Sequence, residues 1–333
     1  MIGGPMYALE RGLKQKWLGV LFALFAGFAC FGIGNGTQGN SITNMVENTF
    51  GISPYISGAV ITILTGLVIL GGVKSIAKVC EKLVPFMAGF YIIGCIIILI
   101  LNHAYVLDAL KLIVSSAFTP KAAGGGFIGS TAMMAIRFGI ARGLFTNEAG
   151  LGSAPIVDAA ASTRNPVRQG LIAMTGVFWD TVIVCALTGL VLVSSILRNP
   201  DGMSGLSGGA LSSAAFANIP VVGPIVLTVG LICFAWSTIL GWSYYGERCW
   251  VYLCGQKAIM PFRIIYTLVV FVGSVMTLDA VWGIADILNA SMAFPNLVAL
   301  LGLSGVIASE TKKYLFDDNM DGWSDDEIPV VDK

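Results

Sequence analysis

Residues 139–155 read GIARGLFTNEAGLGSAP, and this stretch decides how the chain folds. It lies inside a long apolar region, yet it holds four Gly, one Pro, one Arg, one Asn and one Glu. A helix that faces lipid along its whole length would not carry these residues. Non-helical backbone at membrane depth is tolerated only where it is buried in protein or lines a wet cavity. The stretch therefore predicts a broken membrane helix, although a kinked structural helix with a paired Arg142 and Glu148 would also explain it.

Composition places the whole chain in a membrane. The 333 residues are 56% hydrophobic and 11% charged, with a mean hydropathy of +0.83 and a net charge of 0. A soluble domain carries roughly 25% charged residues, so this chain cannot cover a globular surface with polar groups. The only histidine is His103, and no cysteine spacing suggests a metal or disulfide site. These features predict an all-α integral membrane protein that is not an enzyme.

Eight apolar stretches reach the roughly 20 residues that a spanning helix needs. They define a transmembrane domain at 1–313, followed by an acidic cytoplasmic tail at 314–333 that we expect to be disordered. The two long connections at 102–126 and 198–219 are rich in Gly, Ala and Ser, and short helices are expected there. The eight stretches are 17–46, 55–73, 83–101, 127–162, 169–197, 220–247, 262–278 and 280–307.

Basic residues predict the orientation of these spans. With the N-terminus in the cytoplasm, fourteen Lys and Arg fall in the inner connections and ends, and three fall outside, at Lys111, Lys121 and Arg198. Positive residues concentrate on the cytoplasmic side of membrane proteins. Both termini are therefore predicted to be cytoplasmic. A missed or additional span would destroy the alternation of basic-rich inner connections with basic-poor outer connections.

Polar residues also recur at helical spacing within the apolar stretches. Asn35, Gln38 and Ser41 lie at i, i+3 and i+6, and Asp180 stands alone in its stretch. Hydrogen bonds between helices, worth about 0.6 kcal/mol each in membranes, would account for such residues. They explain less well a second face, at i, i+4 and i+7, where hydroxyl and aromatic groups alternate. That face could line a pocket, and it comprises Thr238, Trp242 and Tyr245.

The broken stretch also carries a family resemblance. Residues 143–155, GLFTNEAGLGSAP, resemble the signature of the alanine or glycine:cation symporter family. Residues 31–41, 234–247 and 292–297 resemble further blocks of that family in the same order, so that the likeness covers nearly the whole chain. It implies the leucine-transporter-type fold, an inverted five-plus-five repeat whose first and sixth core helices are unwound.

By this resemblance the eight stretches are core helices 3 to 10, and the stretch around Phe145 is the broken sixth. Core helices 1 and 2, and the family's extra N-terminal helix, are then absent. The first broken helix normally supplies part of the substrate and sodium sites. The expectation is that the chain alone does not transport, or that a partner chain supplies the missing helices.

The resemblance implies sodium-coupled symport of a small neutral amino acid, alanine or glycine, across the cell membrane, without a cofactor. Gln38, Phe145, Thr146, Asn147 and Trp242 would border the amino acid. Glu148 and Asp180 would have structural or gating roles. Ser237 and Thr238 would offer hydroxyl oxygens, which hard cations such as sodium prefer, unless they bond back to their own helix. Alternatives are an inactive or partner-dependent fragment, and symport of another small solute or with protons.

Overall fold

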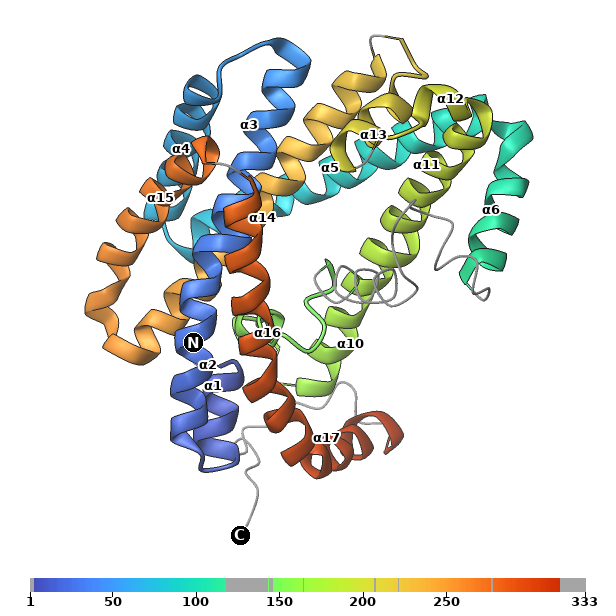
Figure 1. Ribbon diagram of the computed structural model, residues 1–333. Coiled ribbons are helices and arrows are strands. Elements are labelled where there is room, and N and C mark those ends of the chain that lie inside the picture. Colours follow the sequence, from blue (N-terminus) through green and yellow to red (C-terminus); the bar gives the residue numbers. More distant parts are fainter. Residues whose placement is uncertain are drawn as a thin grey trace. The chain divides into compact units, whose positions relative to one another are not determined.

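The described part of the chain is built from helices and their connections, with no strand (Figure 1). The computed structural model describes residues 3–117, 143, 146–163, 165–206, 208–220, 222–276 and 278–317. The helices are α1 Pro5–Tyr7, η1 Ala8–Gly12, α2 Lys16–Phe31, η2 Gly32–Gly36, α3 Thr37–Phe50, α4 Pro54–Leu70, α5 Val73–Leu101, α6 His103–Ala117, α9 Ala154–Asp158, α10 Pro166–Val177, η3 Phe178–Cys185, α11 Ala186–Arg198, α12 Pro200–Met203, α13 Gly208–Phe216, α14 Val222–Cys254, η4 Gln256–Ala258, α15 Ile259–Val275, α16 Leu278–Gly302, α17 Ser304–Thr311 and η5 Lys312–Phe316.

These helices fall into two units. The first unit comprises Met1–Glu81, Glu148–Gly176 and Ala235–Lys333, and the second comprises Lys82–Asn147 and Val177–Phe234. Two long helices, α5 and α14, contribute residues to both. The broken stretch is divided between the units after Asn147.

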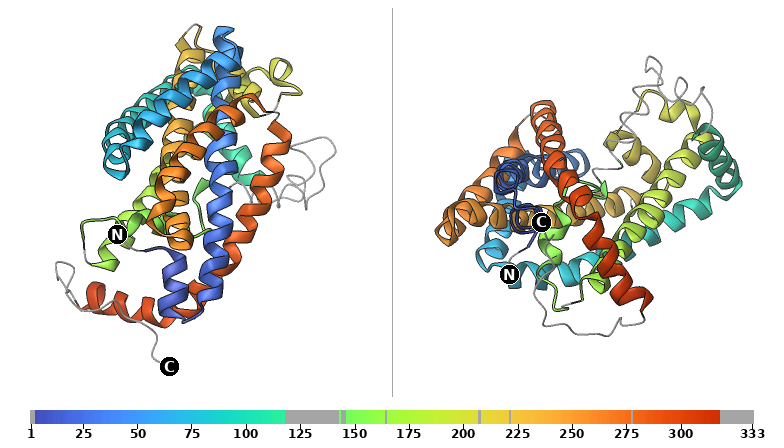
Figure 2. Two further views of the ribbon diagram at one scale, coloured as in Figure 1. Left: turned by 90° about the vertical axis from the view of Figure 1, so that its left-hand side faces the viewer. Right: turned by 90° about the horizontal axis from the view of Figure 1, so that it is seen from below.

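In the first unit, α2, η2 and α3 follow one another without a break, as Figure 2 shows. α15 packs against α3, α4 and η2, and α16 packs against α2. α15 and η2 approach closely at two glycines, because a Cβ placed on Gly273 would lie 2.4 Å from the Cα of Gly36. Small residues let membrane helices approach closely in this way. Gly51, with φ of +68°, ends α3, and Pro54 starts α4 at a position where its missing N–H costs nothing.

The second unit is held together by a buried polar cluster. The Asn102 amide donates to the hydroxyls of Ser194 and Ser195, at 3.2 and 3.0 Å. Its oxygen accepts from Arg198 at 2.8 Å, and Asn218 donates to Ser195 at 3.1 Å. The cluster joins the end of α5 to α11 and to the connection after α13. In the described part of the two long connections, α6, α12 and α13 confirm the prediction of short helices.

Five helical segments of the described chain are long and apolar enough to cross a membrane, and the count is six if one bent pair forms a single span. They are Lys16–Phe50, Val73–Leu101, Pro166–Arg198, Val222–Cys254 and Gln256–Val275, with Asp286–Gly302 and Ser304–Phe316 as the bent pair.

Large apolar side chains lie exposed on the helices, among them Leu67 of α4 at 70% and Leu301 of α16 at 76%. Apolar surface of this extent marks a contact with lipid or protein, because soluble monomers rarely expose it. α4 is apolar but shorter than the five spans, and most of the predicted fourth stretch lies outside the described residues. The chain is therefore a multi-pass helical membrane protein, and the count of eight spans stays a prediction.

Several helix boundaries differ from the predicted stretches, and the start of α5 and the end of α16 differ in informative ways. α5 begins at Val73 rather than at 83, because Lys and Glu are good helix formers and Lys stems can lie along apolar surface. The last stretch does not continue to 307. α16 ends at Gly302, and the helix from Ser304 turns away by 56°, which is visible in Figure 2. Much of the predicted tail, 318–333, lies outside the described residues.

Candidate functional site

The predicted break in the apolar stretch is present in the described residues that follow Asn147. Residues 147–152 form turns and a bend rather than a helix. Glu148 has φ of +51°, and Gly150 and Gly152 have φ of +75° and +83°. Such left-handed backbone is natural for glycine and strained for glutamate, and strain of this kind gathers at functional sites. The chain becomes helical again at α9, where Pro155 lies in the first turn.

The Glu148 carboxylate connects this break to neighbouring backbone and to α14. The Ser153 hydroxyl donates to it at 2.7 Å. The side chains of Tyr245 and Trp242 lie within hydrogen-bonding range of the same carboxylate. On the other side of the break, the Asn296 amide of α16 donates to the Gly150 carbonyl at 2.9 Å. The broken backbone is therefore tied to two long helices of the first unit.

Trp242 is the best-packed of the predicted substrate residues. It is only 4% exposed, and its ring makes an edge-to-face contact with Tyr245 at a centroid distance of 5.4 Å. Its other neighbour is Gly34 of η2, where an added Cβ would lie 2.1 Å from the Cβ of Trp242. The indole can occupy this position only because residue 34 has no side chain. Two residues of the predicted face of α14, Trp242 and Tyr245, therefore pack against each other, and its role in lining a pocket stays a prediction.

Gly34 lies within the π-helical turn η2, and hydrogen bonds with Tyr266 of α15 stabilise this turn. The Tyr266 hydroxyl lies within hydrogen-bonding distance of two carbonyls, those of Gly34 at 2.9 Å and Ile239 at 3.0 Å. The Asn35 amide donates to the Tyr266 carbonyl at 2.8 Å. Turns of this type are frequent at functional sites. The sequence analysis missed Tyr266, because nothing local distinguishes it from other aromatic residues in an apolar stretch.

Gln38 lies directly after this turn on α3 and is half-buried. Its amide donates back to the Ile33 carbonyl at 3.2 Å, and Ser41 donates to Thr37 at 2.7 Å. Asn35 is fully buried, so the three predicted polar residues differ in their surroundings. The π-turn changes the helical phase between Asn35 and Gln38, because it holds more residues per turn than an α-helix.

Ser237 and Thr238, the predicted sodium ligands, are half-buried on α14. The residue before them, Trp236, donates its ring N–H to the Thr65 hydroxyl of α4 at 3.0 Å. This hydrogen bond fixes the rotation of α14 at the predicted cation site. The roles of Ser237 and Thr238 stay predictions.

The second unit holds three further predicted residues. Thr146 is exposed, and the Asn147 side chain accepts from Thr181 at 2.6 Å and donates to the Gly143 carbonyl at 3.2 Å. Asp180 neighbours Thr181 in the π-helical segment η3 and accepts from its hydroxyl at 3.4 Å. The structure thus gathers Asn147, Asp180 and Thr181 in this unit. The predicted substrate residue Phe145 lies outside the described residues.

A buried ionic cluster, also missed by the sequence analysis, is centred on Glu247, two residues after Tyr245 on α14. Glu247 is 5% exposed and accepts from Arg263 at 2.6 Å and from its neighbour Arg248. Arg263 also donates to the Leu70 carbonyl at 3.2 Å, where α4 ends. The sequence does show that these charged residues lie at the ends of predicted apolar stretches. It contains no local pattern that predicts the pairing of Glu247 with Arg263, which is sixteen residues away.

Comparison with known proteins agrees with the predicted family resemblance. The sequence profile of the Sodium:alanine symporter family matches residues 1–326. The sodium/alanine symporter AgcS of Methanococcus maripaludis is 51% identical over 318 residues, which cover 94% of this chain and 69% of the relative. An uncharacterized transporter of Haemophilus influenzae is 50% identical over 332 residues, which cover 98% and 72%.

A more distant relative, the probable sodium/glutamine symporter GlnT of Bacillus subtilis, is 34% identical over 314 residues, covering 94% of this chain and 64% of the relative. The family consists of transporters rather than enzymes, as predicted. The expectation of a partner chain that supplies helices finds no support in these comparisons. The match over residues 1–326, together with 51% identity to AgcS, shows that the chain belongs to the sodium:alanine symporter family.

Proposed function

We propose that the chain carries out sodium-coupled symport of a small neutral amino acid, alanine or glycine, across the cell membrane. The observation that carries this proposal is the packing of Trp242 against Gly34, beside the broken backbone at 147–152. A buried indole that borders the substrate would leave room for a small side chain only. The relative AgcS, which is 51% identical to this chain, is named a sodium/alanine symporter, and this name supports a small amino acid as the substrate.

By the family resemblance, Gln38, Phe145 and Trp242 would border the substrate. Unwound backbone near Thr146 and Asn147 would present free N–H and C=O groups to the amino and carboxylate groups of the substrate. Glu148 would act structurally, because its contacts with Ser153 and α14 tie the break in place. In this proposal the chain has the leucine-transporter-type fold, and the break belongs to the sixth core helix.

We predict that Thr238→Val raises the sodium concentration for half-maximal alanine uptake about tenfold. The reason is that Val keeps the shape of Thr but removes an oxygen ligand, and a hydrogen bond or ligand to a charged group is worth about 1.5–3 kcal/mol. The measurement is uptake of labelled alanine as a function of sodium concentration, by this chain joined to the part of the Methanococcus maripaludis relative that the match leaves uncovered. Thr62→Val is the matched control, since Thr62 bonds back to the Gly58 carbonyl of its own helix. Equal sodium dependence in both variants would remove Thr238 from the cation site.

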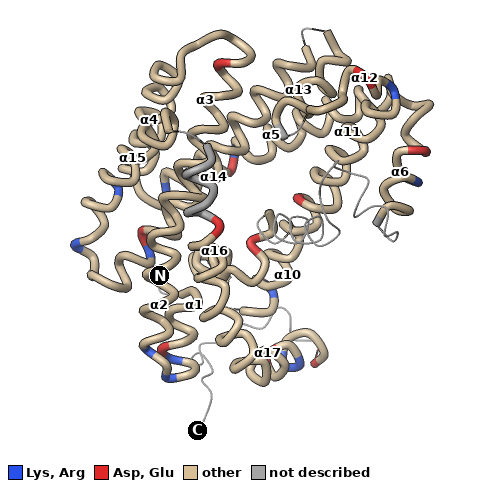
Figure 3. Tube along the Cα trace, viewed as in Figure 1, with Lys and Arg blue, Asp and Glu red and all other residues tan. Residues whose placement is uncertain are grey.

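We also propose eight spans with both termini in the cytoplasm. Within the first unit, the basic residues of η1, of the start of α2 and of η5 gather at the same end, as Figure 3 shows. Reporter fusions after residues 105, 165, 205 and 258 should therefore report outside, inside, outside and inside. The physical reason is the retention of basic connections on the cytoplasmic side. Two neighbouring fusions on the same side would contradict this topology.

A further inference from the structure

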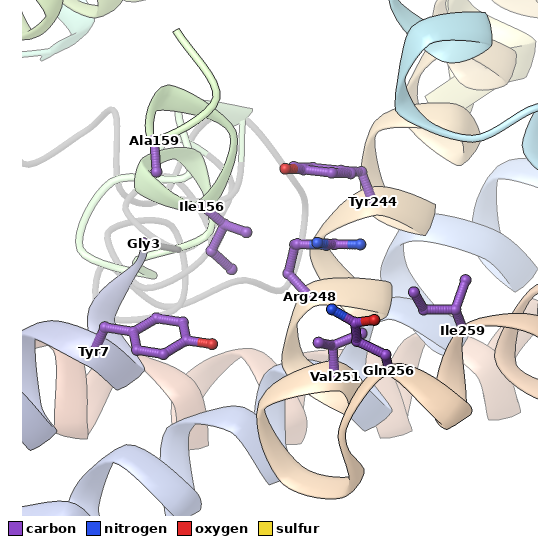
Figure 4. A pocket seen from close by; sticks show the side chains of 9 residues that line it. All are labelled: Gly3, Tyr7, Ile156, Ala159, Tyr244, Arg248, Val251, Gln256 and Ile259. Atoms are coloured by element: carbon purple, nitrogen blue, oxygen red, sulfur yellow. The ribbon is translucent and has the colours of Figure 1, made fainter. Parts of the chain in front are cut away.

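A cavity of about 280 Å³ lies within the first unit, beyond the aromatic cluster of Trp242 and Tyr245. Figure 4 shows its walls, which include Tyr7 near the N-terminus, Tyr244 and Arg248 of α14, and Gln256 after that helix. Ile156 and Ala159 close it from the segment that follows the broken backbone. Arg248 comes six residues after Trp242 on the same helix, a rise of about 9 Å. The cavity is therefore adjacent to the proposed substrate pocket without sharing a residue with it.

The charge at this cavity is positive. Arg248 is its one charged lining residue among those the structure describes, and the lining includes no carboxylate. Arg248 pairs with Glu247, but Glu247 also accepts from Arg263, so one negative charge serves two positive ones. The nearby carboxylate of Asp158 accepts from Gln169 at 2.8 Å and does not line the cavity. Among the described lining residues, an anion placed here would meet one positive charge and no negative charge.

Neutral donors surround the arginine. Figure 4 shows the hydroxyls of Tyr7 and Tyr244 pointing into the cavity from opposite sides. The guanidinium of Arg248 lies over the Tyr244 ring, 5.3 Å from its centroid, which limits its movement. Arginine recognises carboxylates through parallel N–H groups, and tyrosine hydroxyls can add further hydrogen bonds. At ~30 Å³ for each water, the volume corresponds to about nine water molecules, and a six-atom amino acid such as alanine fits within it.

We propose that this cavity is a second binding site, which takes the carboxylate group of a small amino acid through Arg248. The identity of the amino acid rests on the proposed function; the carboxylate site does not. If basic residues mark the cytoplasmic side, a substrate that leaves the Trp242 pocket toward the cytoplasm reaches Arg248 next. The site then holds the released amino acid before it enters the cytoplasm, and it also binds free cytoplasmic carboxylates.

The test is chemical protection of Arg248 in the intact chain. The chain is placed in nanodiscs of phosphatidylcholine and treated with phenylglyoxal, which modifies arginine, and the rate at each arginine is read by peptide mass spectrometry. Acetate and alanine are expected to slow modification of Arg248 at least tenfold at saturation. Alaninamide, which lacks the carboxylate, is expected to have no effect. Arg198 of the second unit is the control arginine, and its rate should not change with acetate.

A variant separates this site from the transport pathway. Trp242→Ala alters the proposed substrate pocket, yet acetate should protect Arg248 in this variant as in the parent chain. Retained protection with lost alanine uptake would support two sites, and uptake without any protection would overturn the inference while leaving the proposed function intact. Three further results would also overturn it: no modification of Arg248 under any condition, equal protection by alaninamide, and protection that requires phosphatidylglycerol, which would indicate a lipid headgroup instead.

Discussion

Glu247→Gln is expected to destabilise the protein by about 3–5 kcal/mol, the cost of breaking a buried ion pair by removing one partner. Glu247 is 5% exposed and accepts from both Arg248 and Arg263. Glutamine preserves the volume, but one of its two terminal groups is an NH₂ that cannot accept a hydrogen bond. Both half-buried arginines then lose their charge partner, and the one that faces the NH₂ also loses its hydrogen-bond acceptor. The measurement is the thermal unfolding midpoint in detergent, followed by tryptophan fluorescence.

Glu10→Gln provides the matched control for this prediction. Glu10 pairs with Lys16 at 3.8 Å, and the Lys16 side chain is 75% exposed. Exposed ion pairs contribute about 0–1 kcal/mol, so the midpoint should stay close to that of the parent chain. The buried cluster joins α14 to α15 and, through Leu70, to the end of α4. An unchanged midpoint in Glu247→Gln would show that this cluster does not stabilise the first unit.

Gly34→Ala is expected to destabilise the protein by about 1–3 kcal/mol and to abolish alanine uptake. The added methyl group would lie 2.1 Å from the Cβ of Trp242 and 2.2 Å from its Cγ, so the indole or the π-turn must move. Thermal unfolding and alanine uptake measure the two effects. Gly89→Ala is the control, because nothing lies within 4 Å of the added atom there and alanine favours the helix.

The double variant Gly34→Ala with Trp242→Gly tests whether this contact is the cause. Glycine at 242 removes both the indole and the Cβ that lies 2.1 Å from the added methyl group, so the double variant should lose less stability than the sum of the two single variants. Trp242→Ala alone should weaken alanine uptake or admit larger amino acids, since it enlarges the proposed pocket. Additive losses of stability would mean that Gly34 is required for another reason. Unchanged affinity and selectivity in Trp242→Ala would remove this residue from the pocket.

The break at 147–152 could be predicted because its cause is local. Glycines and a proline inside an apolar stretch favour non-helical backbone, and Gly150 and Gly152 do adopt positive φ. The shared face of Trp242 and Tyr245 was equally predictable, because it depends only on helical spacing. The family resemblance then linked these residues to a type of function that composition alone does not specify.

Other features depend on residues far away in the chain. The π-turn at Gly32–Gly36 is held by Tyr266, which lies 232 residues after Gly34, and no local pattern indicates this hydrogen bond. The partner of Glu247 is Arg263, on the next long helix. The start of α5 was misplaced for a different reason, because a count of apolar residues excludes lysines that are good helix formers.

The central claim is that a sodium gradient drives uptake of a small neutral amino acid. The most direct measurement uses this chain joined to the part of the Methanococcus maripaludis relative that the match leaves uncovered, reconstituted in proteoliposomes with an inward sodium gradient. We predict concentrative uptake of labelled alanine that ends when sodium is made equal on both sides and that unlabelled glycine inhibits. Uptake of the same size with choline in place of sodium, or uptake driven only by a proton gradient, would contradict the account.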